Sequence, residues 1–246
     1  MWDGYLKNRM NMPLRDFRTV DCEALLNQIT RKRDLGIRTI AHIEHLLSGI
    51  FRYAIRNGFL NGPNPVRDAF LRNAKAPSDT YAYSLTEVWK MIELLPDPAR
   101  TIVAVAGFTG LRRGELRGLR VKDYTAGVLR VQRSIWRKTV GGPKGKRGRG
   151  AVPVIPWLER ILESYIDTIR PNTHLVEGLR GGPIDRENII GSVITPPLAG
   201  LQVTWHGWHA FRRGLATNLH QLGVAGIVIQ AVLNHSDVAS LENHIL

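Results

Sequence analysis

The sequence predicts a mainly helical protein that also contains one small antiparallel β-sheet, an α+β fold. Apolar residues recur at steps of three and four over most of the chain, which is the spacing of one helical face. Residues 128–155 instead contain two short runs typical of strands. A Gly/Pro cluster at 62–65 and a polar stretch at 75–80 interrupt the helical pattern. We therefore expect a small helical domain followed by a larger α+β domain.

The first domain is predicted to span residues 1–73. Its main helix covers residues 36–57, with apolar residues on one face at Ile37, Ile40, Ile43, Leu47, Ile50 and Ala54. Asn57-Gly58 provides the stop signal for this helix. A shorter helix is predicted over residues 21–30, and residues 74–83 have the composition of a linker.

The second domain, residues 84–246, is predicted to begin with a helix that has a capping box at Ser84 and Glu87 and ends at Pro96. A buried helix over 99–109 and a short helix over 112–119 follow. Residues 128–136 are predicted to form one strand and 151–155 its partner, at a sheet edge because Pro153 lacks an N–H. Helices are predicted over 157–169, 209–222 and 225–234, and no element is predicted over 171–204.

The composition indicates a polyanionic partner. Lys and Arg outnumber Asp and Glu by 34 to 21, a net charge of +13, which is typical of nucleic-acid-binding proteins, although an incidentally basic protein would share it. The single cysteine, Cys22, excludes a disulfide framework and a cysteine-rich zinc module, and fits a reducing compartment. No apolar stretch approaches the roughly 20 residues that span a bilayer, and residues 1–7 lack the apolar core of a signal peptide. We therefore expect a cytoplasmic protein without a membrane partner.

His209 and Arg212 lie three residues apart, on one side of the predicted helix 209–222. The apolar stripe of that helix points away from His209 and flanks Arg212; it consists of Phe211, Leu215, Leu219 and Leu222. Neither polar residue is therefore expected to fill the core. The alternative is an ordinary solvated face.

Arg112 lies just after Gly110, at a turn into the predicted short helix. There its planar guanidinium could bind a phosphate with two hydrogen bonds, and Glu115 could hold it in place. The alternative is a surface helix with an ordinary ion pair between residues three apart.

Residues 141–149 carry four cations and no acid. Because they join the two predicted strands, we expect a hairpin tip that brings Lys144 into a cleft. A lysine there could protonate the departing 5′ oxygen of cleaved DNA. The alternative is a mobile basic loop attracted to any phosphate backbone.

His235 follows the predicted helix 225–234, where the helix dipole favours a donating or protonated imidazole. The alternative is a histidine that simply caps the helix.

His206 and His209 have a spacing that could suit a metal. However, no His-Glu-x-x-His motif, paired cysteines or acidic cluster accompanies them, so we expect no metal site.

In order and local frame, these motifs resemble the tyrosine recombinase (phage integrase) family over nearly the whole chain. Residues 109–116 resemble its first arginine box, Pro143-Lys144 its lysine, and residues 209–212 its His-x-x-Arg box. Residues 233–236 resemble its Leu-Gly-His-Ser box, with Asn234 in place of Gly. Residues 36–65 resemble the end of the family's helical core-binding domain, so the second domain would be the catalytic one.

The resemblance implies that a tyrosine hydroxyl forms a covalent 3′-phosphotyrosyl link to DNA, with no metal and no nucleotide cofactor. Arg112 and Arg212 would hold the non-bridging oxygens, Lys144 would protonate the leaving oxygen, His209 would act as acid or base, and His235 would donate to the phosphate. The implied partners are double-stranded DNA and other recombinase subunits, in a tetramer. Further DNA contacts are expected from Arg38, Arg52, Arg137, Lys138, Lys146, Arg147 and Arg149.

The nucleophile of the family has no counterpart in this sequence. No tyrosine follows Tyr165, and His244 and Ile245 occupy the positions that match the family's tyrosine. We therefore expect a nucleoid-associated bacterial or phage-type protein that binds recombination sites without cleaving them, incomplete in both domains. His244 as a substitute nucleophile is the less favoured interpretation. The alternatives are a non-catalytic DNA-binding regulator and a type IB topoisomerase-like enzyme, and the integrase-like first domain disfavours the latter.

Overall fold

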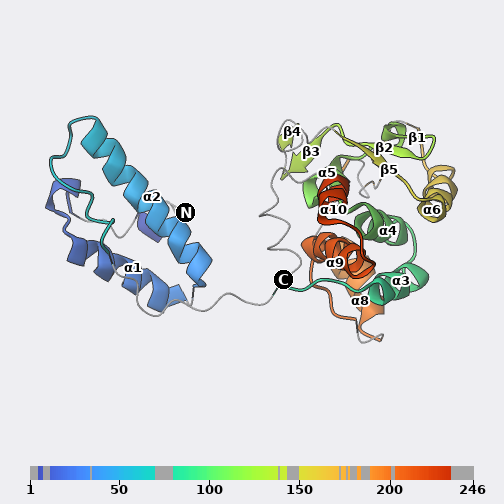
Figure 1. The fold of residues 1–246 in the computed structure, drawn as a ribbon, viewed down its shortest axis with the longest axis horizontal. Coiled ribbons are helices and arrows are strands. Elements are labelled where there is room, and N and C mark those ends of the chain that lie inside the picture. The colour runs from blue at the N-terminus through green and yellow to red at the C-terminus, as the bar shows by residue number, and fades with distance from the viewer. Residues whose placement is uncertain are drawn as a thin grey trace. The chain divides into compact units, whose positions relative to one another are not determined.

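The computed structural model divides the chain into two compact units, Met1–Asp79 and Thr80–Leu246, which are taken in turn (Figure 1). The structure describes residues 5–7, 12–33, 35–69, 80–137, 139–142, 150–171, 173–175, 177, 182–183, 189–200 and 203–233. Helices dominate these residues, together with short antiparallel strands. The predicted fold class is therefore confirmed.

The first unit is built on two helices, α1 (Thr19–Arg33) and α2 (Ile37–Arg56), preceded by the short 3-10 helix η2 (Leu14–Asp16). The buried face of α2 consists of Ile40, Ile43, Leu47, Phe51 and Ala54. Four of the six positions predicted for this face are therefore confirmed, whereas Ile37 is 45% exposed and Ile50 is only partly buried. Helix α1 is longer than predicted at both ends. The carboxylate of Asp21 accepts the backbone N–H of Arg18 (2.9 Å) and stabilises the first turn, and the Thr30 hydroxyl donates to the Leu26 carbonyl (2.8 Å) within the helix.

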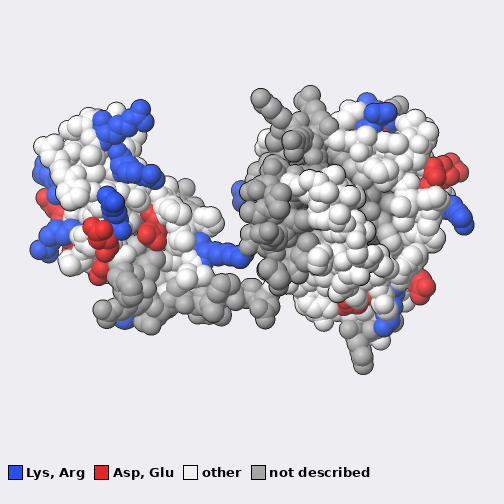
Figure 2. Space-filling model, viewed as in Figure 1, with Lys and Arg blue, Asp and Glu red and all other residues white. Residues whose placement is uncertain are grey.

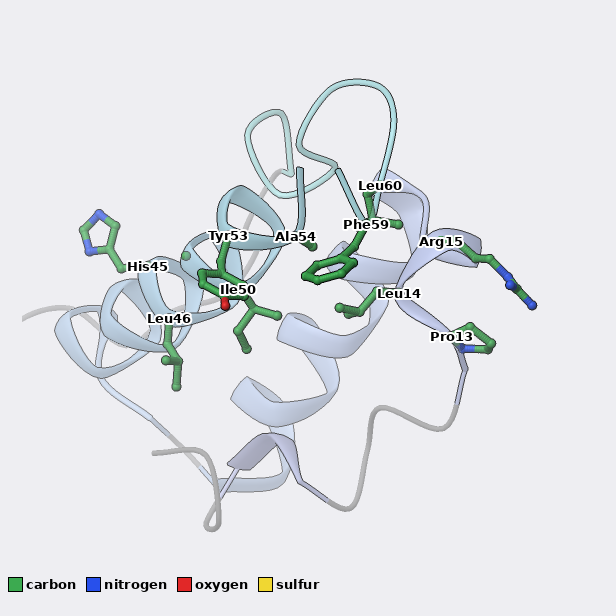
Figure 3. A pocket seen from close by; sticks show the side chains of 11 residues that line it. Pro13, Leu14, Arg15, His45, Leu46, Ile50, Tyr53, Ala54, Phe59 and Leu60 are labelled. Carbon is green, nitrogen blue, oxygen red and sulfur yellow. The ribbon is translucent and has the colours of Figure 1, made fainter. Parts of the chain in front are cut away.

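An open pocket of about 720 Å³ lies in this unit, between α2 and the segments around η2 and Phe59 (Figure 3). Most of its lining is apolar and includes Leu14, Leu46, Ile50, Phe59 and Leu60. Arg15 and His45 also line it, but in Figure 3 their side chains extend away from the apolar ones. Because its lining is apolar, this pocket is not suited to bind a phosphate.

The second unit is organised around α4 (Ala99–Thr109), which is buried along nearly its whole length. It packs against α3 (Leu85–Leu94), α6 (Pro156–Ile166) and α9 (Trp208–Gln221), as Figure 1 shows. The predicted capping box is confirmed: the Ser84 hydroxyl accepts the Glu87 N–H, and the Glu87 carboxylate accepts the Ser84 N–H (2.8 Å). The remaining helices are α5 (Arg113–Gly118), η3 (Val121–Asp123), the π-helix η4 (Ile190–Ile194), α8 (Thr195–Leu198) and α10 (Gly226–Leu233).

Two small antiparallel sheets accompany these helices. The first has the strand order β1 (Tyr124–Thr125), β2 (Val128–Arg130), β5 (Ala151–Pro153), with Leu129 opposite Val152. The edge position predicted for the strand containing Pro153 is confirmed. The second sheet is a hairpin of β3 (Ser134–Trp136) and β4 (Thr139–Gly141).

The prediction of a single strand over residues 128–136 is wrong. The chain leaves the first sheet after Val131, whose N–H bonds to the Gly150 carbonyl (2.9 Å), and at Arg133 it turns toward the helical part of the unit. The Arg133 guanidinium there contacts the Asp123 carboxylate (2.5 Å) and the Gly118 carbonyl (3.1 Å). The basic run 141–149 consequently begins at the last residue of β4 and not at the end of the predicted strand 128–136, and its residues 143–149 lie outside the described residues.

Candidate phosphate-binding site

Arg112 stands at the sharp turn between α4 and α5. Gly110 caps α4 with φ +61°, and a Cβ at this position would lie 2.5 Å from Leu233 Cδ2, so both conformation and space favour glycine. The expected contact with Glu115 is present: Arg112 Nη1 lies 3.1 Å from Glu115 Oε1, and the Arg112 N–H donates to Glu115 Oε2 (2.8 Å). The Glu115 side chain is 4% exposed and that of Arg112 is 31% exposed. The carboxylate therefore holds a guanidinium that still reaches solvent.

Arg212 lies in α9 and connects two backbone segments that are distant in sequence. Its Nη1 donates to the Gly110 carbonyl (2.6 Å), and its Nη2 donates to the Leu233 carbonyl. Burial lowers the pKa of Arg212 to about 10, and the positive charge of Arg112 acts in the same direction. The guanidinium therefore stays charged at neutral pH. It bonds to the carbonyl of Gly110, two residues before Arg112, and to the carbonyl of Leu233, two residues before His235 in the sequence.

His209 precedes Arg212 by almost one turn of α9. Its pKa is lowered from the ordinary value, first by partial burial and then by the positive charges of Arg113, Arg213, Arg212 and Arg112. The side chain nevertheless remains exposed to solvent, and the four guanidinium groups around it disfavour a further positive charge on the imidazole. A neutral imidazole close to several guanidinium groups can exchange a proton with a bound anion.

Arg112, Glu115, His209 and Arg212 thus come from motifs about a hundred residues apart and lie at one place in the fold. Lys144, His235, His244 and Ile245 lie outside the described residues, as do Lys138, Lys146, Arg147 and Arg149. The last described residue before His235 is Leu233, which Arg212 binds. Arg38 and Arg52 lie in the first unit, and Arg137 follows β3.

The expectation that Arg212 would not lie in the core is wrong. Arg212 is 4% exposed, whereas Leu222, assigned to the apolar stripe of this helix, is 73% exposed. The buried face of α9 instead includes small residues, Ala210, Gly214 and Ala216. These small residues allow close packing, and the buried arginine is accommodated because two backbone carbonyls accept its N–H groups.

The β3–β4 hairpin packs directly against α5, beside Arg112, a contact that was not predicted from the sequence. A Cβ on Gly114 would lie 2.4 Å from Ser134 Oγ, and one on Gly118 would lie 2.7 Å from the Arg133 carbonyl oxygen. Arg117 donates to the Ile135 carbonyl (3.4 Å) and the Arg137 carbonyl (3.3 Å). The Gly-x-x-x-Gly spacing of Gly114 and Gly118 could have predicted this contact, because two glycines one turn apart let another backbone approach a helix closely.

An arginine–tryptophan contact lies on the same hairpin. The guanidinium of Arg113 lies over the Trp136 ring, 4.9 Å from its centroid, and Trp136 is 59% exposed. The hairpin therefore presents an aromatic and cationic surface next to Arg112.

Metal ligands do not gather in the part of the chain that the structure describes: no group of three His, Cys, Asp or Glu residues there could hold an ion. The His206 ring stacks on Tyr81 at 3.6 Å between ring centroids. The helices among the described residues include none long and apolar enough to cross a bilayer.

A turn that positions one arginine thus lies beside a helix that carries a histidine and a second arginine, the arrangement expected from the resemblance to the tyrosine recombinases. Residues 84–244 match the model of the phage integrase family, which is more than half of the chain. The chain therefore belongs to the phage integrase family of tyrosine recombinases.

Similar proteins span both units. The chain is 25% identical to the "Tyrosine recombinase XerC-like" protein of Caldanaerobacter subterraneus subsp. tengcongensis, over 98% of this chain and 70% of that protein. It is 26% identical to "Tyrosine recombinase XerD" of Pseudomonas aeruginosa, over 89% of this chain and 75% of that protein.

Solved structures of low sequence identity share the fold. The Tn1549 transposon integrase in complex with transposon right end DNA has a TM-score of 0.80 at 18% identity, covering 96% of this chain and 82% of that one. A λ integrase dimer bound to a COC′ core site has a TM-score of 0.75 at 17% identity, covering 98% of this chain and 84% of that one.

Proposed function

We propose that this chain binds double-stranded DNA at recombination sites and holds one backbone phosphate between Arg112, Arg212 and His209. The observation that carries this proposal is the convergence of the Arg112–Glu115 pair with the helix that bears His209 and Arg212. Charged donors fixed in advance around an anion stabilise the charge that develops on a phosphoryl group during strand cleavage. Lys144 and His235 are proposed to complete the site from residues 143–149 and 234–246.

In the reaction of the family, a tyrosine oxygen bonds to phosphorus while the bond from phosphorus to the 5′ oxygen breaks. The departing oxygen takes a proton, for which Lys144 is the proposed donor, and His209 is the proposed acid or base. The last tyrosine of this chain, Tyr165, is 9% exposed, and burial raises its pKa. It is therefore not a substitute nucleophile, and we propose that these 246 residues bind DNA without forming the covalent link.

This proposal predicts the outcome of a covalent-adduct assay. A radiolabelled duplex with a nick near the cleavage position should show no protein–DNA adduct on a denaturing gel after incubation with the unmodified chain. His244→Tyr or Ile245→Tyr should produce an adduct if the remaining groups are in place, and Ile245→Phe, which lacks the hydroxyl, should not. An adduct formed by the unmodified chain would contradict the proposal.

The first unit offers a second DNA surface along α2. Arg38, His45 and Arg52 are seven residues apart, two helical turns, and His42 and Arg56 fall on the same side; all five are exposed. The buried residues of α2 lie on the opposite side. We name this row of five residues the α2 stripe; it contains no acidic residue and is roughly 27 Å long. In Figure 2, blue side chains project from the part of the unit that α2 forms in Figure 1.

Replacing Arg38 and Arg52 together by alanine should therefore reduce DNA affinity and flatten its salt dependence. Each lost phosphate contact should lower the slope of log K against log salt by about 1. Fluorescence anisotropy with a labelled duplex at several salt concentrations measures this slope. Arg160→Ala is the matched control, because Arg160 is also exposed on a helix, α6. An unchanged slope in the double variant would remove α2 from the proposed DNA surface.

The second unit offers its own proposed DNA surface at the β3–β4 hairpin, where Arg137 is exposed and Arg113 stacks on Trp136. Because they are positively charged, we propose further DNA contacts at Lys138, Lys146, Arg147 and Arg149.

The λ integrase has been solved as a dimer on a core site and as a tetramer on a Holliday junction. We propose that this chain likewise assembles with recombinase subunits on DNA, in the cytoplasm at the bacterial nucleoid. There it would act as a non-cleaving member or regulator of the assembly.

A further inference from the structure

The chain enters the second unit through residues 81–84, named here the lead-in segment. These residues precede α3, yet they lie along α9, more than a hundred residues later in the sequence. The Tyr83 N–H donates to the Ala210 carbonyl (3.2 Å), and the Tyr83 carbonyl accepts from Asn218 Nδ2 (3.2 Å). Arg213, about one helical turn after Ala210, donates from its Nε to the Tyr81 carbonyl (2.7 Å). The lead-in segment is thus bonded to three points along α9.

Close packing accompanies these bonds. A Cβ on Gly214 would lie 2.2 Å from the Tyr83 carbonyl oxygen and 3.0 Å from its nitrogen, so the segment touches the helix backbone itself. Tyr83 is fully buried, and its ring centroid lies 4.5 Å from that of Phe211. Its hydroxyl accepts the His206 N–H (2.6 Å) and donates to the Thr204 carbonyl (3.1 Å). Few rearrangements of α9 would leave these contacts intact.

The residues that contact the lead-in segment and the phosphate-site residues lie in the same stretch of α9. Ala210, Gly214 and Asn218 recur every four residues and form one side of α9, whereas His209 and Arg212 lie on another side. A shift of α9 relative to the segment would therefore move both site residues together. Arg212 would in turn pull on the carbonyls of Gly110 and Leu233, to which it is bonded.

We propose that the lead-in segment is a positioning element for the phosphate site: Tyr83, Gly214 and Asn218 set the placement of α9 and thereby of His209 and Arg212. The role rests on the proposed function of those two residues. Because residues 70–79 connect the first unit to this segment, a displacement at the start of the second unit would be transmitted to the site. The geometry thus couples the chain's entry into the second unit to phosphate binding.

Gly214→Ala and Asn218→Ala test the proposal, with Tyr83→Phe as a milder third variant and Gln221→Ala, exposed on α9, as the control. Titration of the His209 imidazole by NMR in the free protein is the first readout, and its signal is assigned with His209→Gln. Displacing α9 should move His209 away from Arg112 and Arg113 and reduce its burial, so its pKa should rise toward the ordinary value. The second readout is affinity for a short duplex, which should fall about tenfold in Gly214→Ala.

A merely structural role would lower the unfolding temperature and leave the His209 titration of the folded protein unchanged. The proposal would be overturned if Asn218→Ala and Tyr83→Phe lowered the unfolding temperature but left the pKa of His209 unchanged. It would also be overturned if the pKa of His209 and the affinity for DNA were unchanged in all three variants. An upward shift of the pKa of His209 in Asn218→Ala, absent in Gln221→Ala, would support it even if Gly214→Ala fails to fold. Absence of DNA binding by the unmodified chain would instead refute the proposed function, and the titration of free protein would still test the positioning.

Discussion

Arg212→Ala should destabilise the second unit more than most single substitutions in this chain. The substitution removes a side chain that is 4% exposed and leaves the carbonyls of Gly110 and Leu233, both buried residues, without their donor. An unpaired buried polar group costs about 1–3 kcal/mol, so the free energy of unfolding should fall by about 3–5 kcal/mol when the lost packing is included. Urea unfolding followed by tryptophan fluorescence measures this change, since only Trp2 of the six tryptophans lies in the first unit.

Arg212→Lys separates charge from geometry. A lysine keeps the positive charge but lacks the planar fork that reaches both carbonyls, so it should recover only part of the lost stability. The matched control is Arg160→Ala, an exposed arginine on α6, which should change the unfolding free energy by less than about 0.5 kcal/mol. If Arg212→Ala were as stable as this control, the two carbonyl bonds would have no structural role, and Arg212 would serve phosphate binding alone.

Asp123→Ala should have the second large effect. The Asp123 side chain is 1% exposed, and Oδ2 accepts from Arg133 Nη1 (2.5 Å) and from the Arg120 N–H (2.8 Å). Removing one partner of a buried ion pair leaves an uncompensated charge and typically costs about 3–5 kcal/mol. The same urea titration should show this loss, and because Arg133 leads into β3, the hairpin beside Arg112 should become more exposed to proteolysis.

Glu93→Ala provides the comparison for Asp123→Ala, because Glu93 is an exposed carboxylate on α3 of the same unit, so the same tryptophans report its unfolding. The substitution should cost less than about 0.5 kcal/mol. A tryptophan-monitored transition that is the same in Asp123→Ala as in the unmodified chain would contradict the importance assigned to the Asp123–Arg133 pair. Asp123→Asn, which keeps the shape of the side chain and loses its charge, should fall between the two alanine variants.

Local patterns predicted the elements that bury one regular face. The six apolar positions of residues 36–57 predicted α2, and the Ser84–Glu87 spacing predicted the start of α3, because both features depend on neighbours within a few residues. Pro153 predicted an edge strand for the same reason, since a missing N–H has a local consequence. The break between β2 and β3 could not be predicted in this way, because Arg133 turns the chain by contacting Asp123 and Gly118 in other elements.

The sequence by itself determined the family motifs, the strong positive charge and the absence of a tyrosine after Tyr165, since each is a property of residue identity and order. Only the tertiary structure decided that Arg212 is buried against Gly110 and Leu233, and that residues 81–84 lie along α9. These are contacts between segments far apart in the chain, and helical or strand periodicity contains no information about which distant segment packs on a given face. The candidate site was therefore foreseen as a set of residues, and the means by which the fold holds them became visible only in three dimensions.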